Sequence, residues 1–495
     1  MKEINKNNKA FWIFIIAFLI LVLIPFCLSD KFPITIFRFK SKPISYLTYN
    51  DLINLSSKTA LKGRLLSRFQ KQLETPYIEN RWQTNHFSKP YIRVAHWNIE
   101  RGSNINAIKS VFSNRFGYYY SYKKNIQNDQ EEQLKKELND FTKSDIISLN
   151  EVDIGMLRTR YKNIASEIAG ILGYNYAFAT EFVELGPILY KQRIAPSRYL
   201  GLHGNAILSK YPIKSARIIR LPECYKWFES EVGKQNPIEY ARRVGAEAIF
   251  KQQILTEPRR GSRCALVADI ELPDKEVITV VSTHLEDRCY PSCRFKQTQH
   301  LFESLKYIRR PLLLAGDFNT STTDSAPTSL KKEIVKRVRD PNFIARQLAF
   351  AAIPGVPVAS SLLAVGLSKA FQYKDPAVLS IPVLFPNQER KLFAYIKDFR
   401  FADGEGFDIR GDSERSSNGK KGLLANSNER QLKGFESTFK FTEPRVIAYF
   451  KLDWFFVKPK RKRFEPFNGQ TLQLINHSYP GRISDHEPII VDLLL

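Results

Sequence analysis

Residues 146–151 read IISLNE, a short apolar run followed at once by an amide and a carboxylate. A run of this kind predicts a buried strand. A polar helix is predicted just before it, over about residues 129–141, and the alternation of residues 91–97 predicts an earlier strand. Strand, helix and strand in this order predict an α/β fold.

The same pattern of an apolar run ending in polar residues recurs along the chain. Residues 277–282 lead to Thr283-His284, and residues 311–315 lead to the segment GDFN at 316–319. Another strand is predicted over 451–457, and the pair Asp485-His486 precedes a final strand over 489–494. Because a sheet edge brings the ends of distant strands together, we expect these polar side chains to share one pocket.

The predicted pocket contains acids, amides and histidines, which are the groups that a phosphate-cutting site needs. Charged groups seldom lie at buried strand ends without a partner or a function. His96 and His203, in contrast, are interpreted as core histidines because of their strand and turn positions. The candidate site residues are Asn98, Glu151, His284, Asp317, Asn319, Asp453, Asp485 and His486.

The composition favours anionic partners. The 495 residues include 75 lysines and arginines against 50 acids, which gives a formal net charge of +25. Nucleic acid, acidic lipid headgroups and phosphorylated small molecules all fit this charge, and so does an ordinary solvated surface.

The N-terminus has the pattern of a membrane anchor. An apolar run covers residues 10–28 after a lysine-bearing head, and no small-residue cleavage pattern follows it. We therefore expect an uncleaved single-pass anchor, with the catalytic domain outside the cytoplasm, although basic residues in 31–42 weaken the charge asymmetry. The predicted organisation is an anchor at 1–30, a stalk and helical linker at 31–90, and a catalytic domain at 91–495 with an elaboration at about 324–443.

The cysteines leave the redox state open. Beyond the anchor the chain has Cys224, Cys264, Cys289 and Cys293, an even number that permits disulfides in an oxidising compartment. No second pair of ligands follows Cys289 and Cys293 at zinc spacing, so a local disulfide or two thiols is the preferred interpretation there.

Seven short stretches in a fixed order resemble one family. They read WNIE at 97–100, LNEVD at 149–153, GNAILSKYP at 204–212, STHLED at 282–287, AGDFNT at 315–320, LDWFF at 452–456 and SDHEP at 484–488. Together they resemble the endonuclease/exonuclease/phosphatase superfamily, which contains DNase I-like nucleases, inositol-polyphosphate phosphatases and neutral sphingomyelinases. The resemblance spans roughly residues 91–495.

This resemblance implies a four-layer sandwich of two mixed β-sheets flanked by helices, with the predicted transmembrane helix in front of it. It also implies a divalent cation, Mg²⁺ or alternatively Mn²⁺, held by Glu151 with Asn98 and Asp485. Glutamate and aspartate oxygens are the hard ligands that Mg²⁺ accepts.

The remaining candidates receive catalytic roles from the same resemblance. Asp317 is expected to orient or deprotonate the attacking water. Asn319 and His284 are expected to hydrogen-bond the phosphate. His486 is expected to supply a proton or stabilise charge, with Asp453 fixing its orientation.

The predicted function is therefore that of a membrane-anchored, metal-dependent phosphoesterase acting on phosphodiester or phosphomonoester bonds. The anchor and the uncharged segment 347–368, which could dip into a membrane or pack as buried helices, slightly favour a lipid or headgroup substrate. The net charge and the aromatic run at 118–120 keep a DNA or RNA nuclease open. A non-catalytic anion-binding module is the alternative of another class, and no protein partner is predicted.

Overall fold

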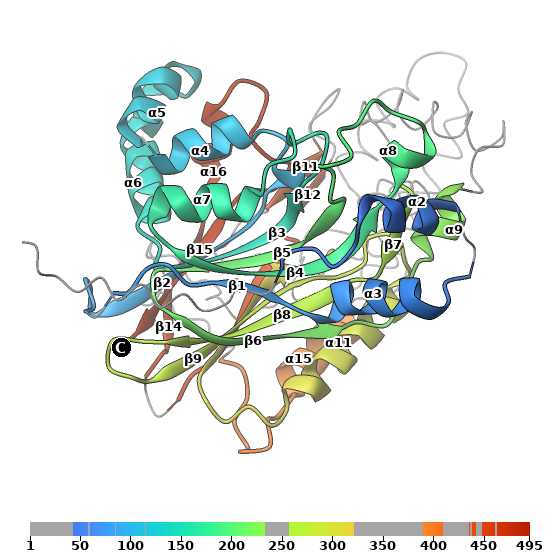
Figure 1. Cartoon of the computed structure of the whole chain (residues 1–495). Helices are drawn as coiled ribbons and strands as arrows, with labels where there is room; N and C mark the ends of the chain where they lie inside the picture. Colours follow the sequence, from blue (N-terminus) through green and yellow to red (C-terminus); the bar gives the residue numbers. More distant parts are fainter. Residues whose placement is uncertain are drawn as a thin grey trace, which may run out of the picture. The chain divides into compact units, whose positions relative to one another are not determined.

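Two β-sheets lie one above the other in the structure, which is a computed structural model (Figure 1). It describes residues 43–57, 60–84, 86–113, 115–232, 257–320, 390–408, 435, 438–441, 448–460 and 463–495, all of which fall within the compact unit Lys42–Leu495. The predicted anchor at 1–30 and most of the predicted elaboration at 324–443 lie outside the described residues.

The first sheet contains eight strands in the order β1-β4-β5-β3-β2-β15-β14, with β7 paired to β4. Its strands β2 and β3 are parallel, and the other neighbours are antiparallel. The bounds are β1 Tyr77–Glu79, β2 Tyr91–Asn98, β3 Ile146–Ile154, β4 Asn175–Glu184, β5 Leu202–Ser209, β7 Arg259–Gly261, β14 Pro466–Thr471 and β15 Ile489–Leu494.

The second sheet contains five strands in the order β13-β10-β9-β8-β6, of which β9 and β10 are parallel. A separate two-stranded sheet pairs β11 with β12. The bounds are β6 Ile213–Arg220, β8 Cys264–Glu271, β9 Val277–His284, β10 Leu312–Asp317, β11 Phe439–Phe441, β12 Ala448–Phe450 and β13 Asp453–Lys458.

Helices cover the outer faces of both sheets (Figure 1). The first sheet is covered by α4 to α7 and α16, and the second by α11 and α15. The bounds are α2 Tyr49–Ser57, α3 Gly63–Glu74, α4 Ile105–Ser113, α5 Arg115–Tyr122, α6 Glu131–Thr142, α7 Ile164–Leu172, α8 Gly186–Leu189, α9 Trp227–Val232, α11 Pro291–Leu305, α15 Arg390–Asp398 and α16 Gln473–Ser478, with 3₁₀ turns at η1 Glu100–Gly102, η2 Lys123–Asn125 and η3 Asn128–Gln130. The predicted layers, two mixed sheets flanked by helices, are confirmed.

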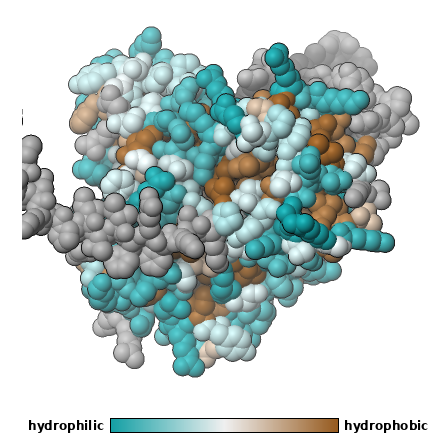
Figure 2. Space-filling view, in the orientation of Figure 1, coloured by the Kyte–Doolittle hydropathy of each residue, from teal (hydrophilic) through white to brown (hydrophobic). Residues whose placement is uncertain are grey.

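Three apolar cores separate these layers. One lies between the first sheet and its helices, one between the two sheets, and one between the second sheet and α11 and α15. The face shown in Figure 2 is mostly hydrophilic, with smaller separate apolar patches. Apolar side chains are therefore concentrated between the layers, where their burial stabilises the sandwich.

The segment predicted as a stalk and linker contributes elements to the first sheet's side of the molecule. It forms α2, α3 and β1, and β1 pairs with β4. Buried Gln72 of α3 donates a hydrogen bond to Thr180 Oγ1 of β4 at 3.0 Å.

The prediction of a membrane-anchored protein is overturned. Within the part of the chain that the structure describes, every helix is too short or too polar to cross a bilayer. Its longest helix, α11, has 15 residues, which at 1.5 Å per residue extend about 22 Å, against a hydrocarbon core of about 30 Å. The transmembrane helix, the membrane as a partner and the single-pass location outside the cytoplasm are corrected accordingly, and the run at 10–28 that suggested them lies outside the described residues.

Candidate active site

The polar strand ends of both sheets meet at one place between them. In the second sheet, Asp317 at the end of β10 is paired in register with His284 of β9 and with Asp453 of β13. In the first sheet, Asn98 at the end of β2 is paired with Asn150 of β3. Hydrogen bonds then cross from one sheet to the other, so the sequence-predicted residues are brought together.

Asp317 lies at the centre of these contacts. Asn98 Nδ2 donates to its Oδ2 at 3.1 Å, and the backbone N–H of Asn319 donates to its Oδ1 at 2.8 Å. Its own backbone N–H donates to Asn150 Oδ1 at 2.8 Å. Burial raises the pKa of Asp317 to about 7, against the lowering effect of neighbouring His486. A carboxylate with such a pKa can accept a proton near neutral pH.

His486 faces Asp317 and is held from behind by Asp453. His486 Nδ1 lies 2.7 Å from Asp453 Oδ2, and His486 Nε2 lies 3.6 Å from Asp317 Oδ2. Burial alone would lower the pKa of His486, but the carboxylates of Asp453 and Asp317 outweigh burial and raise it well above its usual value. The imidazole is therefore favoured as a cation that can donate a proton.

His284 lies on the other side of Asp317 and is neutral. Burial and the guanidinium of Arg263 both lower the pKa of His284, to well below its usual value. Arg263 Nη1 donates to His284 Nδ1 at 2.8 Å, so the neutral imidazole carries its proton on Nε2, 3.4 Å from Asp317 Oδ2. Asn319 lies beside this histidine, where its Nδ2 donates to the carbonyl of Leu285 at 2.9 Å; its Nδ2 is also 3.0 Å from His284 Nε2, a contact between two N–H groups in this tautomer.

Glu151 stands at an irregular position on β3. Its φ is 56°, and the register of β3 against β5 shifts between Leu149 and Val152, which marks a β-bulge. The carboxylate remains partly exposed, and Asn98 Nδ2 lies 3.4 Å from its Oε1. The bulge therefore aims one carboxylate at the solvent side of the pocket.

Carboxylates crowd together on this solvent side. Asp485, also partly exposed, follows Ser484, whose hydroxyl donates to the carbonyl of Asn98 at 2.6 Å. Burial raises the pKa of Glu100 to about 7, and the nearby carboxylates of Asp485 and Glu151 add to this effect, against the lowering effect of Arg482 and Arg101. Mutual repulsion among oxygen donors fits a divalent cation, and their partial exposure leaves room for the waters that Mg²⁺ keeps. The donor set of Glu151, Asp485 and Asn98 therefore fits the predicted ion.

A second grouping could also hold a metal ion. Ligand atoms of Asp317, Asp453 and His486 all lie within 4.8 Å of one another. However, both oxygens of Asp453 are already engaged by imidazoles, and its side chain is fully buried. We therefore favour the partly exposed donors for a hydrated cation, and the buried grouping for proton handling.

Several residues around the pocket were missed by sequence reasoning. Arg263 orients His284, and Asn150 ties Asp317 to the first sheet. Asn205 donates to Glu181 Oε1 at 3.0 Å, and the other oxygen of Glu181 accepts from Arg263 at 3.1 Å. For Asn150, Glu181 and Asn205 the available signal was the alternation of the strands, because these polar residues occupy inward-facing positions where apolar ones would be expected; Arg263 lies between β7 and β8, where strand alternation gives no signal.

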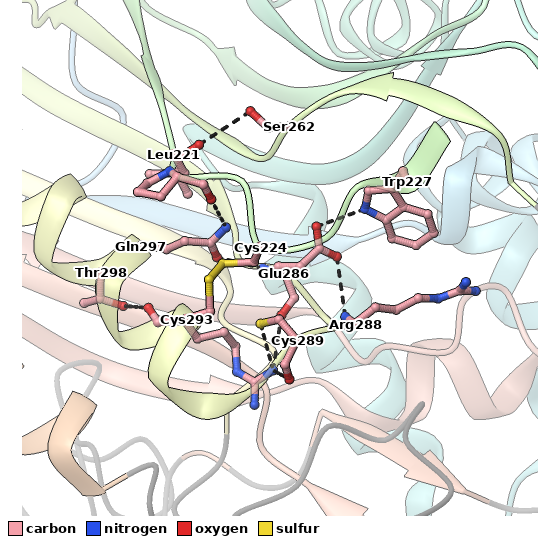
Figure 3. The surroundings of a disulfide bond; sticks show 12 residues. Leu221, Cys224, Trp227, Ser262, Glu286, Arg288, Cys289, Cys293, Gln297 and Thr298 are labelled. Carbon is pink, nitrogen blue, oxygen red and sulfur yellow. Dashed lines mark hydrogen bonds between the residues drawn. A yellow bond between two sulfur atoms is a disulfide. The ribbon is translucent and has the colours of Figure 1, made fainter. Parts of the chain in front are cut away.

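The segment after His284 is fastened by a disulfide between Cys224 and Cys293 (Figure 3). The preferred interpretation of a local disulfide or two thiols at Cys289 and Cys293 is therefore wrong, because Cys293 pairs with the distant Cys224. The bond joins the loop after β6 to α11. Beside it, Trp227 Nε1 donates to Glu286 Oε2 at 2.9 Å, and the backbone N–H of Glu286 donates to Gln297 Oε1 at 3.0 Å. The segment after His284 is therefore held by Trp227 on one side and by Gln297 of α11 on the other.

Comparison with known proteins identifies the family. The family model described as "Endonuclease/Exonuclease/phosphatase family" matches residues 95–486. The chain belongs to this family. Its members are hydrolases that act on phosphate esters, and the resemblance inferred from the sequence is confirmed.

Solved structures with similarity to the chain were also found. An endonuclease/exonuclease/phosphatase from Beutenbergia cavernae is 14% identical, with a TM-score of 0.39, covering 82% of this chain and 72% of that one. The human Nocturnin catalytic domain is 13% identical, with a TM-score of 0.36, covering 86% and 97%. An AP endonuclease from Archaeoglobus fulgidus is 12% identical, with a TM-score of 0.37, covering 82% and 100%. A search of curated protein sequences found no match.

Proposed function

We propose that the chain is a divalent-metal-dependent phosphoesterase that hydrolyses a phosphodiester or phosphomonoester bond. The observation that carries this proposal is the arrangement around Asp317. The carboxylate of Asp317, a proton acceptor, lies between the neutral His284 and the cationic His486. The partly exposed carboxylates of Glu151 and Asp485 lie on the solvent side of the same pocket. Water attack on phosphorus uses a proton acceptor for the water, hydrogen-bond donors for the phosphoryl oxygens and a proton donor for the leaving oxygen.

The proposed division of work follows from protonation. Asp317 holds the attacking water and accepts its proton. The N–H donors of His284 and Asn319 hydrogen-bond the phosphoryl oxygens, where negative charge builds in the transition state. His486, held by Asp453, donates a proton to the leaving oxygen. Glu151, Asp485 and Asn98 would hold the cation, which when bound supplies positive charge against the phosphoryl oxygens.

The group that carries the phosphate ester is to be identified by assay. The lipid or headgroup preference rested partly on the anchor, so its support is now weaker. A test panel should contain a chromogenic phosphodiester, a chromogenic phosphomonoester, plasmid DNA, RNA, sphingomyelin and phosphoinositides. The full chain should turn over at least one of them with added Mg²⁺ or Mn²⁺ and lose that turnover in excess chelator.

A matched pair of substitutions connects this activity to the pocket. Glu151→Gln removes a carboxylate charge at the proposed cation site and should weaken activation by metal. Glu132→Gln makes the same change on α6, where the side chain is 85% exposed, and should behave like the parent. No turnover of any substrate with any metal would contradict the proposal and favour the non-catalytic anion-binding module.

A further inference from the structure

A continuous set of buried polar side chains lies between the two sheets behind the pocket. We call it the inter-sheet network; its members are His96, Ser148, Asn150, Ser282 and Asp453, each 0% exposed. His96, Ser148 and Asn150 belong to the first sheet, and the other two to the second. Buried polar groups are costly unless they are hydrogen-bonded, so each member of this network is expected to have a hydrogen-bond partner.

Asp453 is shared between two imidazoles. His486 Nδ1 lies 2.7 Å from its Oδ2, and His96 Nε2 lies 3.1 Å from its Oδ1. An ionised carboxylate can only accept hydrogen bonds, so both facing nitrogens carry protons. Burial acts to raise the pKa of Asp453, but the two histidines outweigh burial and hold it below its usual value. The carboxylate is thereby kept charged and fixed at both oxygens.

The other side of His96 leads back toward Asp317. His96 Nδ1 lies 3.1 Å from Ser148 Oγ, and a hydrogen bond of 2.9 Å joins Ser148 Oγ and Ser282 Oγ across the sheets. Asn150 Nδ2 donates to Ser282 Oγ at 3.3 Å, and Asn150 Oδ1 accepts from the backbone N–H of Asp317. The chain of hydrogen bonds therefore starts at His486 and ends at the residue that His486 faces.

A purely space-filling role for His96 does not explain why this position holds a polar side chain. Ile92 and Val94 face the same inter-sheet core from the same strand, so an apolar side chain would suit the next inward position. An apolar residue there would leave one oxygen of Asp453 without this donor. A buried carboxylate oxygen that loses its donor is destabilised, and the side chain gains rotamer freedom. His96 thus removes freedom from the carboxylate that aims His486.

We propose that His96 is a positioning residue, which fixes His486 through Asp453 and ties that histidine to Asp317 across the sheets. This role rests on the proposed hydrolytic function. His96 does not touch the reacting atoms, so its loss should lower kcat with little effect on KM. Outer partners of catalytic groups are typically worth 10–100-fold, and a loss in this range is expected.

The test is a double-mutant cycle with the full chain and a substrate that it turns over. His96→Leu should lower kcat about 10–100-fold in the parent and should have almost no effect in the His486→Ala background. His96→Gln keeps an N–H donor near the position of Nε2 and should recover much of the loss. Val94→Ala is the matched control on the same strand, and its small effects should be the same in both backgrounds.

A measurement without turnover separates this inference from the proposed function. The proton of His486 Nδ1, shared with Asp453, should resonate at low field in NMR spectra, and it should shift in His96→Leu but stay near its place in His96→Gln. A cooperative unfolding transition well above the assay temperature in each variant would exclude a general loss of folding. Equal kcat losses from His96→Leu in both backgrounds, or an unmoved proton resonance, would overturn the positioning role even if hydrolysis is established.

Discussion

The space between the two sheets has an apolar end and a polar end, although the same strands build both. On β2, the inward positions change from Ile92 and Val94 to His96 and Asn98. On β9, they change from Ile278 and Val280 to Ser282 and His284. Successive inward residues are two apart in a strand, so each strand crosses from one end to the other within a few residues.

This difference separates what holds the fold from what does the chemistry. The apolar end contains side chains whose burial stabilises the sandwich, such as Leu313 and Leu266. The polar end contains groups whose burial is unfavourable without partners, and hydrogen bonds across the sheets, such as those from Asn98 to Asp317 and between Ser148 and Ser282, satisfy several of them. Substitutions at the two ends should therefore separate activity from stability.

The largest effect is expected from Asp317→Asn at the polar end. The amide keeps the shape of the side chain but cannot accept the proton of the attacking water, so kcat should fall about 10²–10⁴-fold. Stability should stay equal or rise, because an ionisable group in a buried site is removed. Steady-state kinetics and thermal unfolding of the same preparations measure both quantities, and a variant with parental kcat would refute the assigned role.

The opposite behaviour is expected from Leu313→Ala at the apolar end. This residue precedes Asp317 on the same strand and is fully buried, so truncation should reduce the free energy of unfolding by about 2–5 kcal/mol. Its kcat should stay within about twofold of the parent while the chain is folded, since it touches no proposed catalytic group. Denaturant titration is the measurement. Should kcat fall as far as in Asp317→Asn, the two ends would not be separable.

The disulfide lies outside both ends and should act on stability alone. Cys224 and Cys293 are separated by 69 residues, so the double substitution Cys224→Ser with Cys293→Ser should reduce the free energy of unfolding by about 2–4 kcal/mol. Denaturant titrations with and without a reducing agent measure this. The reducing agent should destabilise the parent and leave the double variant unchanged; equal sensitivity in both would show that the bond contributes nothing.

The smallest effect is expected from Glu137, a buried carboxylate on α6 that is remote from the pocket's proposed chemistry. Its Oε2 accepts from the backbone N–H of Leu474 at 2.8 Å, and burial raises its pKa to about 7 from an ordinary 4.5. A raised pKa in the folded state favours the protonated form, so this contribution is complete below the unfolded pKa and is lost as pH rises through about 7.

The parent should therefore lose about 1–3 kcal/mol of unfolding free energy from this group between about pH 5 and 8. Glu137→Gln should remove that part of the slope, whereas Glu132→Gln, exposed on the same helix, should keep it. Denaturant titrations at several pH values provide the measurement. If the unfolding free energy of Glu137→Gln falls with pH as steeply as that of the parent, the burial of Glu137 is not the cause of this pH dependence.

Local patterns in the sequence predicted the strands and the candidate residues, whereas the four layers were implied by the family resemblance. Apolar runs such as 146–149 marked the strands, and the residue following each run marked its polar end. The sequence did not predict Arg263 or the role now proposed for His96. Their partners are Glu181, His284 and Asp453, on other strands, and only the folded register shows those pairings. His96 was interpreted as a core histidine, and it is indeed buried, but its contact with Asp453 shows that a core position does not exclude a positioning role.

The predicted anchor failed for a different reason. None of the described helices is long and apolar enough to span a bilayer, and the run at 10–28 on which the prediction depended lies outside the described residues. The disulfide was also beyond prediction, because four cysteines allow several pairings and only geometry selects among them. The cysteine count therefore limits the possible pairings without choosing one.

The bulge at Glu151 makes the pocket sensitive to chain length as well as to residue type. Val152 packs in the helix-side core and Asp153 reaches His203 from the next strand, an assignment of faces that exists only because one extra residue is accommodated there. Deleting a single residue at this point would exchange the two faces, and would drive a carboxylate into the apolar layer beneath α7. Homologues that keep every motif residue but differ here by one position would therefore not be expected to share the same arrangement of ligands.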